Sequence, residues 1–118
     1  MPHVVLDGNV EFRNVFESFK PLFIRNGDKI LKTSTKYIDS EEKSILVEAL
    51  AVEKNSRTSF LALISRREDG VVVRIHPHSN IEKTAGVKMI LVEIAKQLLN
   101  IFPKLKVGKT NLQDFLRT

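Results

Sequence analysis

The middle of the chain is a series of strand-like segments joined by short turn sequences, and this series constrains the fold more than any other feature. Four segments, residues 29–38, 44–54, 57–68 and 71–76, are rich in β-branched and aliphatic residues and alternate between two faces. The turn sequences before and between them are Asn26-Gly27-Asp28, residues 39–42, Asn55-Ser56 and Asp69-Gly70. Because short turns join antiparallel neighbours, the sequence predicts a four-stranded antiparallel meander.

A phenylalanine-rich segment near the start of the chain has the period of a helix. Its apolar residues fall at i, i+3, i+4 and i+7 on one face, and they are Phe12, Val15, Phe16 and Phe19. Pro21 ends this helix, since proline has no backbone donor and restricts the residue before it. A stripe of rings at this spacing favours a core-facing helix over a platform for stacked bases. The earlier run Val4-Val5-Leu6 is typical of a short edge strand.

The longest helix is expected in the C-terminal half of the chain. Ser79 and Glu82 have the spacing of a capping box, in which two side chains satisfy free backbone donors at a helix N-terminus. An apolar stripe continues from there to Phe102, which a proline follows. Thr110 and Gln113 repeat the capping spacing more weakly and predict a short final helix.

These segments predict one α+β domain over residues 1–118. Its elements are a four-stranded antiparallel meander sheet, an N-terminal amphipathic helix and a long C-terminal helix on one face, in the order α-β-β-β-β-α. A short N-terminal strand and a short C-terminal helix complete the order. The length suits one domain of about 100–150 residues, and 42% apolar with 28% charged residues is an ordinary globular balance.

The cellular location is predicted from the absence of cysteine, of a membrane-spanning segment and of a secretory signal in the sequence. The chain has no cysteine, so it forms no disulfide or thiolate metal site, which suits a reducing cytoplasm. No segment approaches the roughly 20 uninterrupted apolar residues of a membrane span, and the first residues lack the pattern of a secretory signal. We therefore expect a cytoplasmic protein with no membrane partner.

Alternation assigns the side chains of the last three strands to two faces of the sheet. If Lys54 opposes Arg57 and Glu68 opposes Val71, one face is entirely apolar. Its members are Val47, Ala49, Ala51, Phe60, Ala62, Ile64, Val71, Val73 and Ile75. The small alanines leave space for a helix to approach closely, so this face is the predicted core and the long helix its cover.

The second face retains more apolar residues than a solvated sheet needs. It carries the leucines and valines Leu46, Leu50, Leu61, Leu63, Val52 and Val72 among polar residues. If residues 29–38 keep their uncharged side in the core, Lys32 and Lys36 border these leucines. An apolar centre with basic edges is typical of a binding surface. The purely structural alternative is that the phenylalanine-rich helix packs over this face and buries it in the protein interior.

Charge favours a phosphate-rich partner for the second face. Nineteen Lys and Arg residues against fourteen Asp and Glu give a net charge of +5, which attracts polyanions. The nucleic-acid hypothesis assigns phosphate contacts to Lys32, Lys36, Arg57, Arg66, Arg67 and Arg74. Tyr37 is the one ring expected near a sheet surface, so contacts are predicted to be mainly to the backbone and sensitive to salt.

Besides an enzyme whose site appears only in the fold, two alternatives remain open. In the first, the protein is a homo-oligomeric interaction module that buries Leu50, Leu61 and Leu63 against a second copy. In the second, a basic C-terminal group serves as an anion-binding tail, formed by Lys104, Lys106, Lys109 and Arg117. Light scattering and salt-dependent retention on an oligonucleotide separate self-association from phosphate binding.

Two short motifs suggest chemistry, but neither has the context that the chemistry needs. Gly108-Lys109-Thr110 resembles the end of a phosphate-binding loop, yet a helix precedes it instead of a strand. His76 and His78 offer two imidazoles, but no acidic residue is close to them in sequence. The sequence therefore predicts a non-catalytic binding domain without a metal, a cofactor or a small-molecule substrate.

Overall fold

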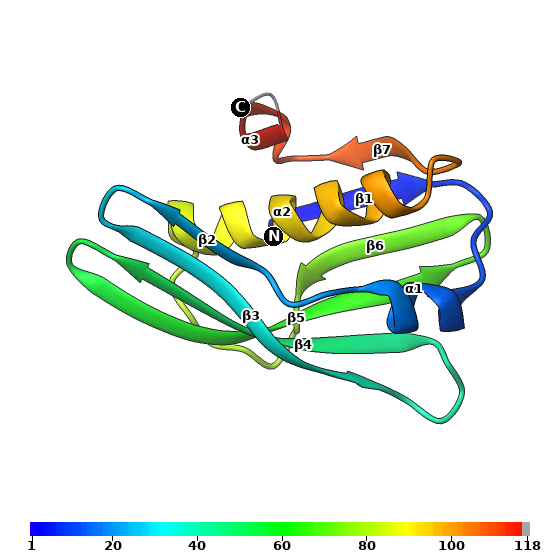
Figure 1. The fold of residues 1–118 in the computed structure, drawn as a ribbon, viewed down its shortest axis with the longest axis horizontal. Coiled ribbons are helices and arrows are strands. Elements are labelled where there is room, and N and C mark those ends of the chain that lie inside the picture. Colours follow the sequence, from blue (N-terminus) through cyan, green and yellow to red (C-terminus); the bar gives the residue numbers. More distant parts are fainter. Residues whose placement is uncertain (117–118) are drawn as a thin grey trace.

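The computed structural model describes residues 1–116 as an α+β fold in which an antiparallel sheet curls around a long helix (Figure 1). In this range seven strands form one half-barrel sheet in the order β2-β3-β4-β5-β6-β1-β7. The strands are β1 (His3–Asp7), β2 (Phe23–Asn26), β3 (Lys29–Ile38), β4 (Ser44–Glu53), β5 (Ser56–Arg67), β6 (Gly70–Ile75) and β7 (Lys106–Thr110). The helices are α1 (Phe12–Ser18), α2 (Ala85–Ile101) and α3 (Gln113–Leu116).

The predicted meander is present, but it is only the centre of a wider sheet. Strands β3 to β6 pair in sequence order, as predicted, while β2 extends the sheet beyond β3, and β1 and β7 extend it beyond β6. The prediction of four strands is therefore wrong, and β1 is not an edge strand because β7 pairs with its other side. None of the helices in residues 1–116 is long and apolar enough to cross a membrane.

The two hairpin turns lie one residue earlier than predicted. Glu53 pairs with Ser56, and Arg67 pairs with Gly70. Each predicted pair is thus displaced by two positions on one strand, and an even displacement leaves every side chain on its predicted face. Gly70 has a φ of 155°, and a Cβ there would lie 2.0 Å from the backbone oxygen of Leu6, so the close approach of β1 requires glycine.

Helices α2 and α1 pack on the same face of the sheet, called here the inner face. The inner-facing residues of α2 include Val87, Leu91 and Leu98, each with an exposed fraction of 0%. They belong to one apolar core with the predicted strand residues and with Phe12 and Phe19 of α1. The phenylalanine-rich helix therefore does not cover the second face, and the prediction that the long helix covers the apolar face is confirmed.

Helix α2 begins five residues later than the capping box predicts. Thr84 is its N-cap, and the Thr84 hydroxyl accepts a hydrogen bond from the Val87 backbone N–H at 3.2 Å. A second acceptor is the Glu53 carboxylate, whose Oε1 lies 2.9 Å from the Gly86 nitrogen. Residues 76–84 are consequently a connection without helix or strand, and Ser79 is free to take part in another site.

A bulge in β3 changes the face of every residue beyond it. Thr33 pairs with Ala49 and Lys36 with Val47, so β3 has one more residue than β4 over this stretch, and side chains after it switch faces. The prediction that Lys36 lies beside Lys32 on the second face is therefore wrong. The bulge instead moves Tyr37 to that face.

Lys36 lies on the inner face and binds the C-terminal end of helix α1. Its ammonium donates hydrogen bonds to the backbone oxygens of Phe16 and, at 3.0 Å, of Phe19. It also lies 4.8 Å from the centre of the Phe16 ring, which adds a cation–π contact. Burial and then the charge of Lys20 lower the pKa of Lys36, while Glu17 opposes them. A cation at a helix C-terminus complements the free carbonyls there.

Candidate functional site

The side of the sheet that faces away from α2, called here the outer face, is not covered by a helix within residues 1–116. Strand register places charged, aromatic and apolar side chains on it. On its β2 to β5 part lie Phe23, Arg25, Ile30, Lys32, Ser34, Tyr37, Leu46, Glu48, Leu50, Val52, Arg57, Ser59, Leu61 and Leu63. The face is continuous across four hydrogen-bonded strands and supplies the candidate site.

The leucines of this face are unequally accessible. Leu50 and Leu61 are half-buried, whereas Leu63 is only 6% exposed. Leu63 lies between Leu46 and Arg74 on the neighbouring strands, and so it has little surface left for a partner. Of the three leucines predicted to form an oligomer interface, the structure leaves Leu50 and Leu61 available to one.

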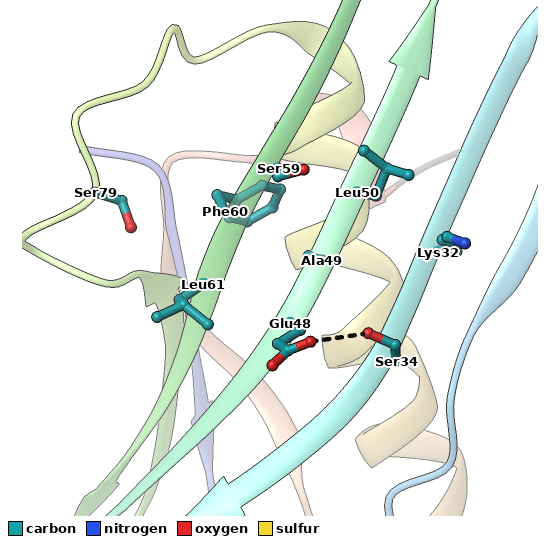
Figure 2. Close-up of a pocket in the computed structure, with 9 residues that line it drawn as sticks. All are labelled: Lys32, Ser34, Glu48, Ala49, Leu50, Ser59, Phe60, Leu61 and Ser79. Carbon is teal, nitrogen blue, oxygen red and sulfur yellow. Dashed lines mark hydrogen bonds between the residues drawn. The ribbon is translucent and has the colours of Figure 1, made fainter.

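A hollow of about 500 Å³ lies in the outer face (Figure 2). Its walls are Lys32, Ser34, Glu48, Ala49, Leu50, Ser59, Phe60, Leu61 and Ser79. Figure 2 shows Lys32 and Ser34 on one side of the hollow and Ser79, from the connection 76–84, on the other. Glu48, Leu50 and Leu61 lie between them, so the floor combines one carboxylate with two apolar side chains.

Two hydroxyl groups hold the Glu48 carboxylate. Tyr37 donates from its hydroxyl to Glu48 Oε2 at 2.5 Å, and Ser34 donates to Oε1 at 3.4 Å. The bond to Glu48 and then burial raise the pKa of Tyr37, which keeps the phenol protonated as a donor. Among the described residues Glu48 forms no ion pair. The carboxylate is therefore oriented by neutral groups and keeps its charge unneutralised.

Two exposed rings flank the hollow. Phe23 is 68% exposed and Tyr37 is 48% exposed, and Phe23 pairs across the strands with Lys32. The sequence reasoning placed a single ring near a sheet surface and missed Phe23, because it did not predict β2. The signal was the Asn26-Gly27 turn, since such a dipeptide between two strand-like runs is typical of a hairpin.

The six predicted basic contacts do not form one cluster. Lys32 lies in the hollow, and Arg57 lies at the same end of the sheet, where it pairs with Val52. Val52 also pairs with Ile30, which pairs with Arg25. Arg25, Lys32 and Arg57 are all exposed, and we call them the basic group; Arg25 was not predicted.

The remaining predicted cations lie elsewhere. Arg66 and Arg67 are at the opposite end of β5, about 30 Å from Arg57 at roughly 3.3 Å per residue, and they point to opposite faces. Arg74 is half-buried beside Leu63, and its Nε makes no hydrogen bond among the described residues. Lys36 is on the inner face, as described above.

The C-terminal basic group is remote from the hollow. Lys106 and Lys109 belong to β7, the edge strand beyond β1, and Lys104 precedes it. Arg117 lies outside the described residues. The hollow opens on β3, β4 and β5, with β6 and β1 between it and β7, so these lysines form a separate surface.

Neither the Gly108-Lys109-Thr110 sequence nor the pair His76 and His78 forms a binding site among the described residues. Gly108 lies in β7, where an added Cβ would be 2.3 Å from the Asp7 carboxylate, so this glycine allows close packing of β7 on β1. The rings of His76 and His78 are 5.3 Å apart. Within residues 1–116, no group of three or more His, Cys, Asp or Glu residues is arranged to hold a metal ion.

The site thus comprises an open hollow with polar and apolar walls, the Glu48 carboxylate held by two hydroxyl groups, two exposed rings and three cations. All of them lie on one face of one sheet. Such a surface offers groups for stacking, for hydrogen bonding and for attraction of phosphates. No family model, curated protein or solved structure matches this chain.

Proposed function

We propose that this protein binds single-stranded nucleic acid across the β2 to β5 part of the outer face. In this proposal Phe23 stacks on a base, and the basic group of Arg25, Lys32 and Arg57 contacts phosphates. The observation that carries the proposal is the exposure of Phe23, at 68%, on the same face as Lys32 and across the strands from it.

Stacking favours a single strand over a duplex. An unpaired base offers its whole ring face, and stacking on an aromatic side chain contributes about 1–3 kcal/mol per base. In a duplex the bases are already stacked on each other, so a ring on a sheet surface gains nothing from them. The hollow of about 500 Å³ lies within the ~300–1,000 Å³ typical of ligand sites, which gives a base next to Phe23 room to enter.

The charge distribution favours a polyanion over a second copy. A dimer formed through the outer face would bring two sets of Arg25, Lys32 and Arg57 together, and like charges facing each other are destabilising. Glu48 is the one acidic side chain in the hollow. A nucleic acid instead places phosphates beside these cations. Binding is favourable because each phosphate that a cation neutralises releases counterions.

Fluorescence anisotropy with labelled oligonucleotides of about 10 nucleotides tests this proposal. We expect single strands to bind more tightly than duplexes, and Phe23→Ala to weaken single-strand binding by about 5- to 150-fold. Lys32→Ala should reduce the slope of log affinity against log salt by about 0.7. The matched control is Lys104→Ala, which removes an exposed cation away from the hollow. Equal losses for Lys32→Ala and Lys104→Ala contradict the proposed site.

The second candidate is a homo-oligomer, and the half-buried state of Leu46, Leu50 and Leu61 favours it. A second copy would remove these side chains from water at about 25 cal/mol for each Å² of apolar surface. Light scattering at high protein concentration, with Leu61→Lys as the disrupting variant, tests it. A monomer at every concentration excludes a self-association role for the outer face.

A further inference from the structure

The Glu48 carboxylate opposes the binding of phosphates to the outer face. It lies on the floor of the hollow, near Lys32 in the wall, and its negative charge repels every phosphate that Lys32 attracts. A neutral side chain in its place would bind a polyanion more tightly. Its orientation by Tyr37 and Ser34, at 2.5 Å and 3.4 Å, is consistent with a specific acceptor role.

We propose that Glu48 recognises the Watson–Crick edge of a base in the hollow and selects guanine. This inference rests on the proposed function, since it requires single-stranded nucleic acid on the outer face. A carboxylate accepts two parallel hydrogen bonds on its two oxygens, as it does from arginine. Guanine presents two adjacent donors on that edge, the N1–H and the 2-amino group. Each other base presents one donor there beside ring or carbonyl acceptors, which repel the second carboxylate oxygen.

The bonds already made to Glu48 leave it able to accept from a base. Each carboxylate oxygen has about two acceptor positions, and Ser34 and Tyr37 each occupy one position on different oxygens. Both oxygens therefore keep an open position. Because Tyr37 and Ser34 lie on β3, they also fix the carboxylate relative to Lys32 on the same strand.

The walls of the hollow suit a planar base beside this carboxylate. Leu50 and Leu61 flank Glu48 on β4 and β5, since Leu61 is its cross-strand partner. Apolar neighbours reduce competition by water and strengthen a charge-assisted hydrogen bond. Phe23 lies on β2, two interstrand spacings of about 4.8 Å from β4. A base stacked on Phe23 and a base at Glu48 therefore belong to different nucleotides of one strand, with Lys32 between them.

The test measures base preference with oligothymidine strands that carry one central guanine, adenine, cytosine or inosine. One guanine per strand avoids guanine self-assembly, and inosine differs from guanine only by lacking the 2-amino group. We expect the guanine strand to bind about 5- to 100-fold more tightly than the others, and inosine to lose most of this gain. The oligouridine series with the same central bases shows whether the preference applies to RNA, to DNA or to both.

A matched pair of variants separates recognition from a structural role of Glu48. Glu48→Gln should abolish the preference for guanine and raise the affinity for unsubstituted oligothymidine, because it removes a charge that repels phosphates. Tyr37→Phe breaks the 2.5 Å bond but keeps the carboxylate, so it should retain part of the preference. Far-ultraviolet circular dichroism establishes that both variants are folded, and the inosine comparison requires no variant.

The outcomes distinguish the two proposals. Binding of equal strength to all of the strands overturns guanine selection and leaves the proposed function standing. Absence of binding to any single strand, at low salt and with folded protein, overturns both. A guanine preference that survives in Glu48→Gln, or that inosine retains in full, also overturns the assignment to Glu48.

Discussion

The inner and outer faces of β4 and β5 are built from the same strands, yet they differ in what surrounds them. On the inner face Val47 and Ala62 are 0% exposed, because they belong to the apolar core that this face forms with α1 and α2. On the outer face Leu50 and Leu61 are half-buried and have no helix over them within residues 1–116. Apolar content alone therefore does not define the core of this protein. The covering element does, and apolar residues on the uncovered face stay partly exposed.

The charged residues of the two faces differ in the same way. On the inner side Lys36 donates to carbonyls at the end of α1, and Glu53 accepts from the Gly86 N–H at the start of α2. On the outer face Lys32 and Glu48 take part in no ion pair among the described residues. The charged side chains of the inner face thus bind backbone groups at helix ends. Those of the outer face make no such contact with a helix in residues 1–116.

The largest expected contrast is between two apolar residues of β5. Ile64, on the inner face, is 0% exposed, and Ile64→Ala should lower the free energy of unfolding by about 2–5 kcal/mol, since it leaves a cavity. Leu61 on the outer face is half-buried, and Leu61→Ala should lower it by about 1 kcal/mol. Urea denaturation followed by circular dichroism measures both. Equal losses would show that the outer face is closed in solution, which contradicts its role as a binding surface.

A smaller contrast is expected between two carboxylates of β4. Glu53→Ala removes the acceptor of the Gly86 N–H at the N-terminus of α2, and should cost about 1–2 kcal/mol of stability. Glu48→Ala removes only bonds to exposed hydroxyls, so we expect a change within about 0.5 kcal/mol. Thermal and urea unfolding of the two variants provide the comparison. A larger loss for Glu48→Ala than for Glu53→Ala would mean that Glu48 is structural, and would weaken its assignment to base recognition.

The inner face was predictable because it depends only on alternation. The predicted turns were displaced by one residue, but the displaced pairs kept their parity, so Ala62 and Val73 lie where expected. Alternation fails where β3 gains a residue between Thr33 and Lys36. No residue in this stretch of sequence marks the bulge. One extra residue was sufficient to make the predicted face of Lys36 wrong.

The limits of prediction for the outer face have a different cause. Strand β7 pairs with β1 across about the whole length of the chain, and no local pattern reports such a pairing. Strand β2 is four residues long, too short for alternation to be recognised, and its omission hid Phe23 and Arg25. Lys32 and Arg57 were placed correctly because they lie on long strands before any bulge. The candidate site was therefore half predicted, with its centre found and its aromatic edge missed.

The smallest contrast is between two lysines of β3. Lys36→Met leaves the carbonyls of Phe16 and Phe19 without their donor, and should lower stability by about 1 kcal/mol. Lys32→Met replaces an exposed cation beside Leu50, and should change stability by less than about 0.5 kcal/mol. The binding result should be reversed, because Lys32 contacts phosphate in the proposed function and Lys36 does not. Urea unfolding and anisotropy on the same two variants measure both quantities.

The pH dependence of stability sharpens this last comparison. Burial and Lys20 lower the pKa of Lys36 below its ordinary value of 10.5. Between the lowered pKa and 10.5 the unfolded chain holds more protons at this residue than the folded chain, so the contribution of Lys36 to stability rises with pH. The stability difference between the wild type and Lys36→Met should therefore increase as the pH is raised toward 10.5. A difference that shrinks as the pH rises would contradict the lowered pKa of Lys36 in the folded protein.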